Sequence, residues 1–233
     1  MKKALQLMTA YFIVLGLVIA LAAVGSKTAT SIAAQAPLKN RKCVIIDAGH
    51  GGVDGGATSC TGVLESNLNL EIATKLNDLL HLLGISTRMI RTDDRSVYTS
   101  GQTIAAKKVS DLKERVRVAN STNDAILISI HQNHFVDGRY HGAQVFYAAT
   151  DSSKELASIM QNALKNHLEQ ASNRNIKKGE GIYLLENINC TGILIECGFL
   201  SNPVEEAKLR STDYQQRICC IIGSSLSTFL SNT

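Results

Sequence analysis

The sequence predicts one α/β domain built on a six-stranded, mostly parallel sheet with helices on both faces. Short apolar runs of strand length alternate with segments whose apolar residues recur every three or four positions, and several of the runs end in glycine-rich sequence. Such alternation is typical of crossover connections between parallel strands. The 233 residues, 45% of them hydrophobic, can bury one such core, so we expect a domain over residues 41–233 and an N-terminal appendage over residues 1–40.

The first half of the domain is expected to alternate strand, helix, strand, loop and helix. Lys42–Asp47 is short, apolar and β-branched, which favours a strand. The following apolar residues have helical spacing until Gly84, and they are Leu68, Ile72, Leu76, Leu79, Leu80 and Leu83. Ser86–Arg91 has strand composition, and Thr92–Ser110 is polar without periodicity and is therefore interpreted as a loop. A helix is expected over Asp111–Asn120.

The second half continues the alternation. Ala125–His131 is a strongly apolar strand candidate, and Gly142–Ala148 is a shorter one. Ser152 or Ser153 is expected to cap a helix through about Gln170, because five apolar residues lie along one side of it. Two further strands are predicted over Gly181–Leu185 and Gly192–Glu196. A turn is expected before Pro203, and an amphipathic helix over Asp213–Leu230.

The first 40 residues differ from the rest in charge and hydropathy. They hold four lysines and no acid, so the net charge of +4 arises there, and the rest of the chain has 20 basic and 20 acidic side chains. A neutral domain without basic runs gives no support to nucleic-acid binding. Lys2 and Lys3 precede the uncharged run Ala4–Ser26, which is long enough to meet and span a membrane. Ala34-Gln35-Ala36 also fits a signal-peptidase site, so a membrane anchor and a cleaved signal both stay open, and either exports the domain.

Four ionisable side chains lie at the ends of apolar or glycine-rich segments. His50 lies in D-A-G-H-G-G, Glu65 follows a second glycine-rich stretch, His131 ends I-S-I-H, and Glu196 ends G-I-L-I-E. An isolated ionisable group at the end of a buried strand is costly unless it is paired or binds a metal. Because open α/β sheets place their sites at strand ends, we expect a common site.

Two neutral imidazoles and one carboxylate suit zinc. His50, Glu65 and His131 would fill three of four tetrahedral positions and leave the last one for water. Zinc lowers the pKa of bound water from about 15.7 towards roughly 7. Glu196 is then expected to take the water proton and return it to the departing nitrogen, an effect typically worth on the order of 10² to 10⁴ in rate. One Zn²⁺ is therefore the expected cofactor.

Each assignment has a simpler alternative. His50 could be an exposed histidine of a glycine-rich turn, and His134 competes with His131. Glu65 taken alone would be an ordinary acid at a helix start, stabilised by the helix dipole. Glu196 could belong to a buried ion pair. The glycine-rich loop lacks the G-x-G-x-x-G pattern and the lysine of phosphate-binding loops. The six cysteines have no Cys-x-x-Cys spacing to hold a metal, and because a domain with its own core needs no disulfide framework, we assign no disulfide.

Four ordered segments together carry a family resemblance: D-A-G-H-G-G, L-E-S-N-L-N-L, S-I-H-Q-N and E-C-G-F-L-S-N. They resemble the zinc N-acetylmuramoyl-L-alanine amidases of the third amidase family, over nearly the whole predicted domain. The resemblance implies a phosphorylase/hydrolase-like α/β fold and hydrolysis of the amide between N-acetylmuramic acid and L-alanine in peptidoglycan. It also implies that His50, Glu65 and His131 are zinc ligands and that Glu196 is the catalytic glutamate. Asn133, in the third segment, is expected to contact substrate.

The chain also resembles the germination-specific, spore-cortex branch of that family. The residues that carry this resemblance are Arg91, Asp94, Lys108, Asp111, Arg115 and Asn120, followed by G-I-Y-L-L near Tyr183. It implies removal of stem peptides so that muramic-δ-lactam can form in the cortex, outside the cytoplasm of a developing spore. Ala48, Ile90 and His134 depart from the usual pattern without removing a ligand. An accessory protein that controls activity or metal loading is a further expectation, with the 92–110 loop as its docking surface.

Two other functions fit the same residues. A zinc peptidase acting within the stem peptide would use the same metal, water and glutamate, and it would release single amino acids instead of intact stem peptides. A non-catalytic wall-binding protein would keep the fold and bind peptidoglycan without cleaving it.

Overall fold

The computed structural model describes residues 42–168 and 172–232. The anchor or signal predicted over residues 1–40 lies outside them. Among the described residues, no helix combines the length and the apolar character that a membrane crossing requires.

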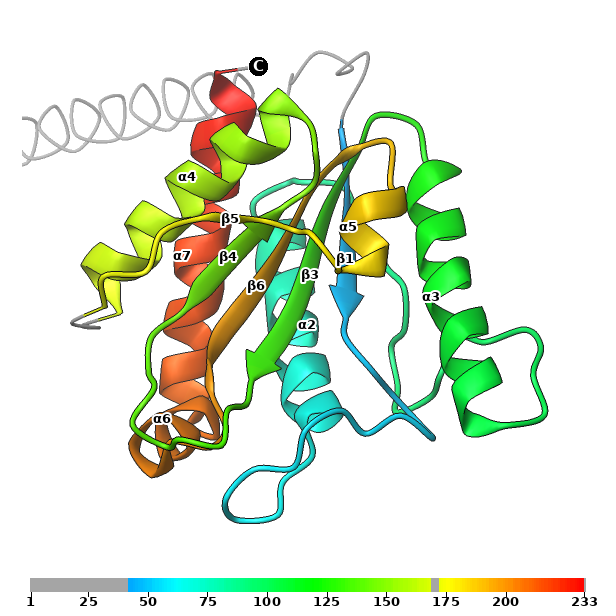
Figure 1. The fold of residues 1–233 in the computed structure, drawn as a ribbon. Helices are drawn as coiled ribbons and strands as arrows, with labels where there is room; N and C mark the ends of the chain where they lie inside the picture. Colours follow the sequence, from blue (N-terminus) through cyan, green and yellow to red (C-terminus); the bar gives the residue numbers. More distant parts are fainter. Residues whose placement is uncertain (1–41, 169–171, 233) are drawn as a thin grey trace, which may run out of the picture. The chain divides into compact units, whose positions relative to one another are not determined.

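A six-stranded sheet forms the centre of the domain, in the order β2-β1-β3-β6-β4-β5 (Figure 1). The strands are β1 (Cys43–Ala48), β2 (Thr87–Met89), β3 (Ala125–Asn133), β4 (Gln144–Tyr147), β5 (Lys177–Lys178) and β6 (Thr191–Phe199). Strands β2, β1, β3 and β6 are mutually parallel, whereas β4 runs antiparallel to β6 and β5 runs parallel to β4. The predicted six-stranded, mostly parallel sheet is confirmed.

Helices cover both faces of this sheet, as predicted (Figure 1). The helices are α2 (Glu65–Leu82), α3 (Ile104–Asn120), α4 (Asp151–His167), α5 (Tyr183–Asn187), α6 (Pro203–Leu209) and α7 (Thr212–Ser231). Side chains alternate along β3, so that Ile126, Ile128 and Ile130 share one apolar core with α2, α4 and α7. Leu127 points the other way and packs with residues of α3 and α5. The face towards α3 and α5 carries the site described below.

The strand predicted over Gly181–Leu185 is wrong, because α5 lies there and the outer strand is β5 instead. Gly181 has a φ of +78°, which turns the chain out of an extended path. Leu184 and Leu185 then bury against the sheet beside α3. A short apolar run does not distinguish a strand from a buried helix. The hydrophobicity of this run correctly predicts burial, but the run is too short for its spacing to predict the type of element.

Two helix boundaries also differ from the prediction. Helix α3 begins at Ile104, inside the segment expected as a loop, and the Thr103 side chain caps it by accepting from the Ala106 amide at 3.1 Å. Helix α4 is capped by Thr150, just before the predicted serines. In addition, α6 forms where only a turn was expected, with Asn202 as its cap.

Candidate metal centre

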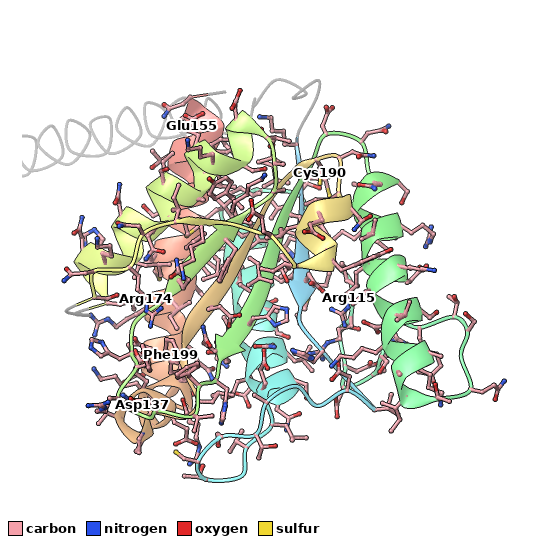
Figure 2. All side chains as sticks on the ribbon, in the orientation of Figure 1. Arg115, Asp137, Glu155, Arg174, Cys190 and Phe199 are labelled. Atoms are coloured by element: carbon pink, nitrogen blue, oxygen red, sulfur yellow. The ribbon has the colours of Figure 1, made fainter. Side chains whose placement is uncertain are left out.

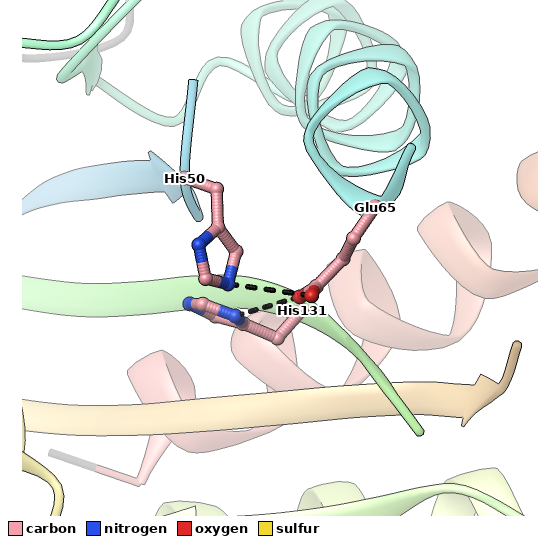
Figure 3. Close-up of side chains that lie close together, drawn as sticks. All are labelled: His50, Glu65 and His131. Atoms are coloured by element: carbon pink, nitrogen blue, oxygen red, sulfur yellow. Dashed lines mark hydrogen bonds and ion pairs between the residues drawn. The ribbon is translucent and has the colours of Figure 1, made fainter. Parts of the chain in front are cut away.

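Three of the predicted site residues converge at the carboxyl end of the sheet (Figure 3). His50 lies in the loop after β1, Glu65 is the first residue of α2, and His131 lies on β3. His50 Nε2 is 3.3 Å from Glu65 Oε2, and His131 Nδ1 is 3.0 Å from Glu65 Oε1. One possible ligand atom of each residue lies within 4.8 Å of the other two. Among the described residues, His134 belongs to no such group.

The carbonyl groups of the loop that carries His50 are bound by two buried arginines. Arg91 donates to the carbonyls of Ala48 at 2.8 Å and Gly49 at 2.9 Å. Arg115 donates to the carbonyls of Ala48 at 3.0 Å and His50 at 2.7 Å. His50 itself has a φ of 61°, a left-handed conformation that costs a non-glycine residue energy unless its surroundings hold it there. The guanidinium groups supply that support.

Arg115 extends from α3 into a buried charge cluster next to the sheet (Figure 2). It pairs with Asp47 of β1 and, at 2.6 Å, with Asp111 one helical turn away. Ser129 of β3 donates to the second Asp47 oxygen at 2.7 Å. Burial alone would raise the pKa of Asp47, but the charges of Arg115 and His131 and the hydrogen bonds from Ser129 and Arg115 together outweigh it, and the pKa lies below its ordinary value. The cluster therefore stays ionised and ties α3 to the ends of β1 and β3.

Glu65 is held as an ionised carboxylate. Its Oε2 accepts from the Ala57 amide at 3.0 Å, and its Oε1 accepts from the Gln132 amide at 3.1 Å. Burial would raise the pKa of Glu65, but hydrogen bonds and charge from His131 and His50 lower it far below the ordinary value. A buried, ionised carboxylate between two imidazoles matches the donor set of a metal site.

Glu196 of β6 lies beside His131, its register partner in β3. Its Oε2 is buried and has no hydrogen-bond partner among the described residues. Burial raises the pKa of Glu196 to about 7, against the opposing charge of His131. An unpartnered carboxyl group that titrates near neutral pH is suited to accept and donate a proton.

In the metal-free protein, Glu196→Gln should raise the free energy of unfolding at about pH 8. Because the folded pKa lies above the ordinary value of 4.5, at about 7, the stability contributed by this group is complete below 4.5 and is lost as the pH rises through 7. Glutamine does not ionise, so the gain should approach about 3 kcal/mol, at roughly 1.4 kcal/mol per pKa unit. Urea unfolding in chelator at about pH 4.5 and pH 8 measures it. The same gain in stability at both pH values would contradict the raised pKa of Glu196.

The three converging residues fit a zinc ion by donor type and by space. Tetrahedral zinc holds ligands at about 2.0–2.2 Å, so ligand atoms lie roughly 3.3–3.6 Å apart. The two imidazole nitrogens lie 3.3 and 3.0 Å from the two oxygens of Glu65, and one possible ligand atom of each residue lies within 4.8 Å of the others. Two glycines make room for the side chains. A Cβ added at Gly49 would lie 2.3 Å from the His131 ring, and one at Gly56 would lie 2.6 Å from Glu65 Oε2. The backbone is thus shaped around the cluster.

Gly56→Ala should weaken zinc binding by about tenfold or more, because the new methyl group displaces Glu65 and His50. Gly62→Ala is the matched control. Both glycines have positive φ, but a Cβ at Gly62 meets nothing within 4 Å. Zinc affinity by chelator competition, with thermal unfolding of both variants, separates the clash from backbone strain. Equal zinc affinities in the two variants would mean that the Gly56 contact is irrelevant to the metal.

A cavity of about 110 Å³ adjoins the cluster on the α3 and α5 side of the sheet. It is lined by residues that include His50, His131, Lys108, Leu112 and Tyr183. Asn133 lies half-buried at the end of β3, where its backbone carbonyl accepts from the Leu200 amide at 2.8 Å. The structure therefore places Asn133 on the same strand end as His131.

Four side chains that build this site had no role in it predicted from the sequence: Asp54, Arg91, Lys108 and Arg115. The spacing of His50 and Asp54 in one glycine-rich loop was the available signal. Arg91, Lys108 and Arg115 were indicated only by the family resemblance, because their contacts with the His50 loop join segments that are distant in sequence. None of the six cysteines forms a disulfide, and Cys197, next to Glu196, is buried.

Comparison with known proteins gives a consistent family. Residues 44–227 match the sequence model of the N-acetylmuramoyl-L-alanine amidase family. The germination-specific N-acetylmuramoyl-L-alanine amidase of Bacillus subtilis is 36% identical over 183 residues, which are 78% of this chain and 76% of the relative.

Solved structures agree with this comparison. The CwlD amidase of Clostridioides difficile, solved in complex with the GerS lipoprotein, matches with a TM-score of 0.79 at 37% identity, covering 82% of this chain and 100% of that one. An N-acetylmuramoyl-L-alanine amidase from Clostridium difficile 630 matches with a TM-score of 0.73 at 34% identity, covering 84% of this chain and 100% of the other. The fold and the sequence therefore point to the same relatives.

Proposed function

The chain belongs to the N-acetylmuramoyl-L-alanine amidase family, and from this premise we propose that it is a zinc-dependent enzyme that frees intact stem peptides from peptidoglycan. An amidase of this family acts on cell wall, at the amide between N-acetylmuramic acid and L-alanine. The observation that carries the zinc proposal is the convergence of His50, Glu65 and His131 beside the unpartnered carboxyl group of Glu196. These are the same four residues that the sequence motifs single out.

His50, Glu65 and His131 would hold one Zn²⁺. The chemistry that zinc would supply there is a lower pKa of bound water, from about 15.7 towards roughly 7, and polarisation of the carbonyl under attack. Two imidazoles and one carboxylate leave a position for water and substrate, as catalytic zinc sites require. The lowered pKa of Glu65 supports this role, because the carboxylate is already ionised.

Glu196 would move the proton. Its Oε2 takes a proton from the attacking water and returns it to the nitrogen of L-alanine, so that the amide bond breaks and a neutral amine leaves. Its pKa of about 7 supports both steps near neutral pH, and its burial limits exchange of that proton with bulk water. Asn133, at the end of the same strand as His131, is proposed to contact the substrate.

The biological setting is proposed from the relatives. The germination-specific relative favours a role in the spore cortex, with stem-peptide removal preceding muramic-δ-lactam formation. Residues 41–233 would be the catalytic domain, exported by an anchor or signal in residues 1–40. The CwlD structure holds a lipoprotein, which favours a protein partner for this chain too. The spore-cortex role is tested by expressing this chain in a spore-forming bacterium whose own germination-specific amidase has been deleted. Muramic-δ-lactam should return to the cortex, and a cortex without it would contradict the proposed role.

Mass spectrometry of wall digests tests the reaction and the metal together. Purified protein is incubated with wall fragments in chelator and after zinc is restored. Zinc-dependent release of intact stem peptides that begin with L-alanine supports the proposal. Release of single amino acids would make the protein a peptidase, and cleavage that survives metal removal would overturn the zinc assignment. Tight wall binding without any cleavage would indicate a binding protein.

A further inference from the structure

Asp54 lies on the side of His50 that faces away from Glu65. The His50 ring contacts Asp54 Oδ2 through Nδ1 at 2.9 Å and Glu65 Oε2 through Nε2 at 3.3 Å. An ionised carboxylate only accepts hydrogen bonds, so Nδ1 carries the hydrogen in its contact with Asp54. Glu65 is an ionised carboxylate as well, so Nε2 also carries a hydrogen while no metal is bound. A metal ion on that side would replace the Nε2 hydrogen, and the contact with Asp54 would keep the other hydrogen on Nδ1. The contact with Asp54 fixes both the tautomer and the plane of the ring.

Backbone hydrogen bonds hold the loop that carries both His50 and Asp54. The Gly51 amide donates to the Asp54 carbonyl at 2.8 Å, and the Asp54 amide donates to the Gly51 carbonyl at 3.1 Å. This reciprocal pair closes a tight turn directly after His50. Asp54 is therefore held at a fixed distance from the ring by main-chain bonds, independently of any side-chain contact.

Lys108 holds the second oxygen of Asp54. Its Nζ lies 3.1 Å from Asp54 Oδ1, and the side chain comes from the second turn of α3. The Asp54 side chain is 21% exposed and that of Lys108 is 51% exposed, so water screens the ion pair in part. With Oδ1 directed to Lys108, Oδ2 is left for His50. The chain Lys108–Asp54–His50 thus links α3 to the metal cluster.

We propose that Asp54 is a positioning residue that sets the tautomer and orientation of His50 for metal binding, and that Lys108 orients Asp54 in turn. This inference rests on the proposed zinc function. Outer partners of metal-bound histidines typically change metal affinity by about 10–100-fold when removed. The half-exposed Lys108 pair should contribute much less, about two- to fivefold.

Zinc affinity of the purified protein tests the proposal, measured by chelator competition. Asp54→Ala should weaken zinc binding by about 10–100-fold, Asp54→Asn by less, and Lys108→Met by about two- to fivefold. Asp93→Asn and Lys107→Met are matched controls. Asp93 forms an exposed pair with Arg95, and Lys107 lies over Tyr98, so neither side chain contacts His50. Both controls should bind zinc as the wild type does.

Cobalt substitution gives a readout that a merely structural role would not move. The visible absorption of Co²⁺ in the site should shift in Asp54→Asn, because a neutral amide oxygen holds the Nδ1 hydrogen of His50 more weakly than a carboxylate does, and it should not shift in Asp93→Asn. Wild-type zinc affinity and cobalt spectra in folded Asp54→Asn would overturn this inference and leave the proposed function intact. A wild-type protein that binds no zinc would overturn both.

Discussion

Glu196→Gln should lower kcat for wall hydrolysis by about 10² to 10⁴ while leaving zinc affinity close to that of the parent protein. Glutamine keeps the shape of the side chain but can neither take the water proton nor return it to the leaving nitrogen. Glu196 is not part of the cluster formed by His50, Glu65 and His131, so its replacement removes no proposed ligand. Stem-peptide release from wall fragments at saturating zinc measures the loss.

The matched control is Glu155→Gln, on the exposed side of α4 and remote from the cluster (Figure 2). It should retain the parent rate. A Glu196→Gln protein that binds zinc and still cleaves at the parent rate would remove Glu196 from catalysis. The expected gain in stability of the metal-free Glu196→Gln protein makes misfolding a poor explanation for lost activity. The same substitution is thus expected to stabilise the metal-free fold at about pH 8 and to slow turnover.

The strands that carry the site could be predicted because each is a continuous apolar run that ends at an ionisable residue. Residues of β1, β3 and β6 are buried on both faces, so their hydrophobicity alone identifies them. Side chains alternate along a strand, so His131 lies on the same face of the sheet as Leu127, and Glu196 on the same face as Leu194. Both leucines pack beside α3 and α5, so His131 and Glu196 share that face. The parallel sheet then brings these ends together.

Glu65 shows the limit of single-residue inference. By itself it is an acid in the first turn of a helix, as many helices have. Only its combination with two histidines indicated a metal site, and the structure places its carboxylate within 3.3 Å of both rings. The two helices that were misplaced fail for a different reason. Helix α5 depends on the turn at Gly181, and the first turns of α3 expose their apolar residues, Ile104 and Val109 among them, so neither carries a periodic signal.

Long-range polar contacts could not be predicted, and they are what shapes the loop around His50. Arg115 meets Asp47 across 68 positions of sequence and Arg91 meets Gly49 across 42, and both contacts depend on strand register. No local pattern specifies such pairs. Their energetic weight has to be read from burial, which is nearly complete for Arg91 and Arg115.

Arg115→Met should lower the free energy of unfolding by about 3–5 kcal/mol, the loss expected when one partner of a buried ion pair is removed. Methionine matches the length of the arginine stem but leaves Asp47 charged and buried, with Ser129 as its one remaining side-chain donor in the part of the chain that the structure describes. It also removes the donors to the Ala48 and His50 carbonyls. Urea unfolding at neutral pH measures the change, with the slope checked for two-state behaviour.

Arg117→Met on the same helix is the control, because Arg117 forms an exposed pair with Glu114 that water screens, and its loss should change stability far less than the loss of Arg115. If both variants lose similar stability, the buried cluster is not what holds the domain.

Arg115→Met combined with Asp47→Asn should recover part of the loss, since it removes the orphaned charge. It should not recover zinc affinity, because the His50 carbonyl stays without its donor and the strained φ of His50 loses its support. Recovered stability with weakened metal binding would separate the two tasks of this arginine: neutralising Asp47 and shaping the loop for its ligand.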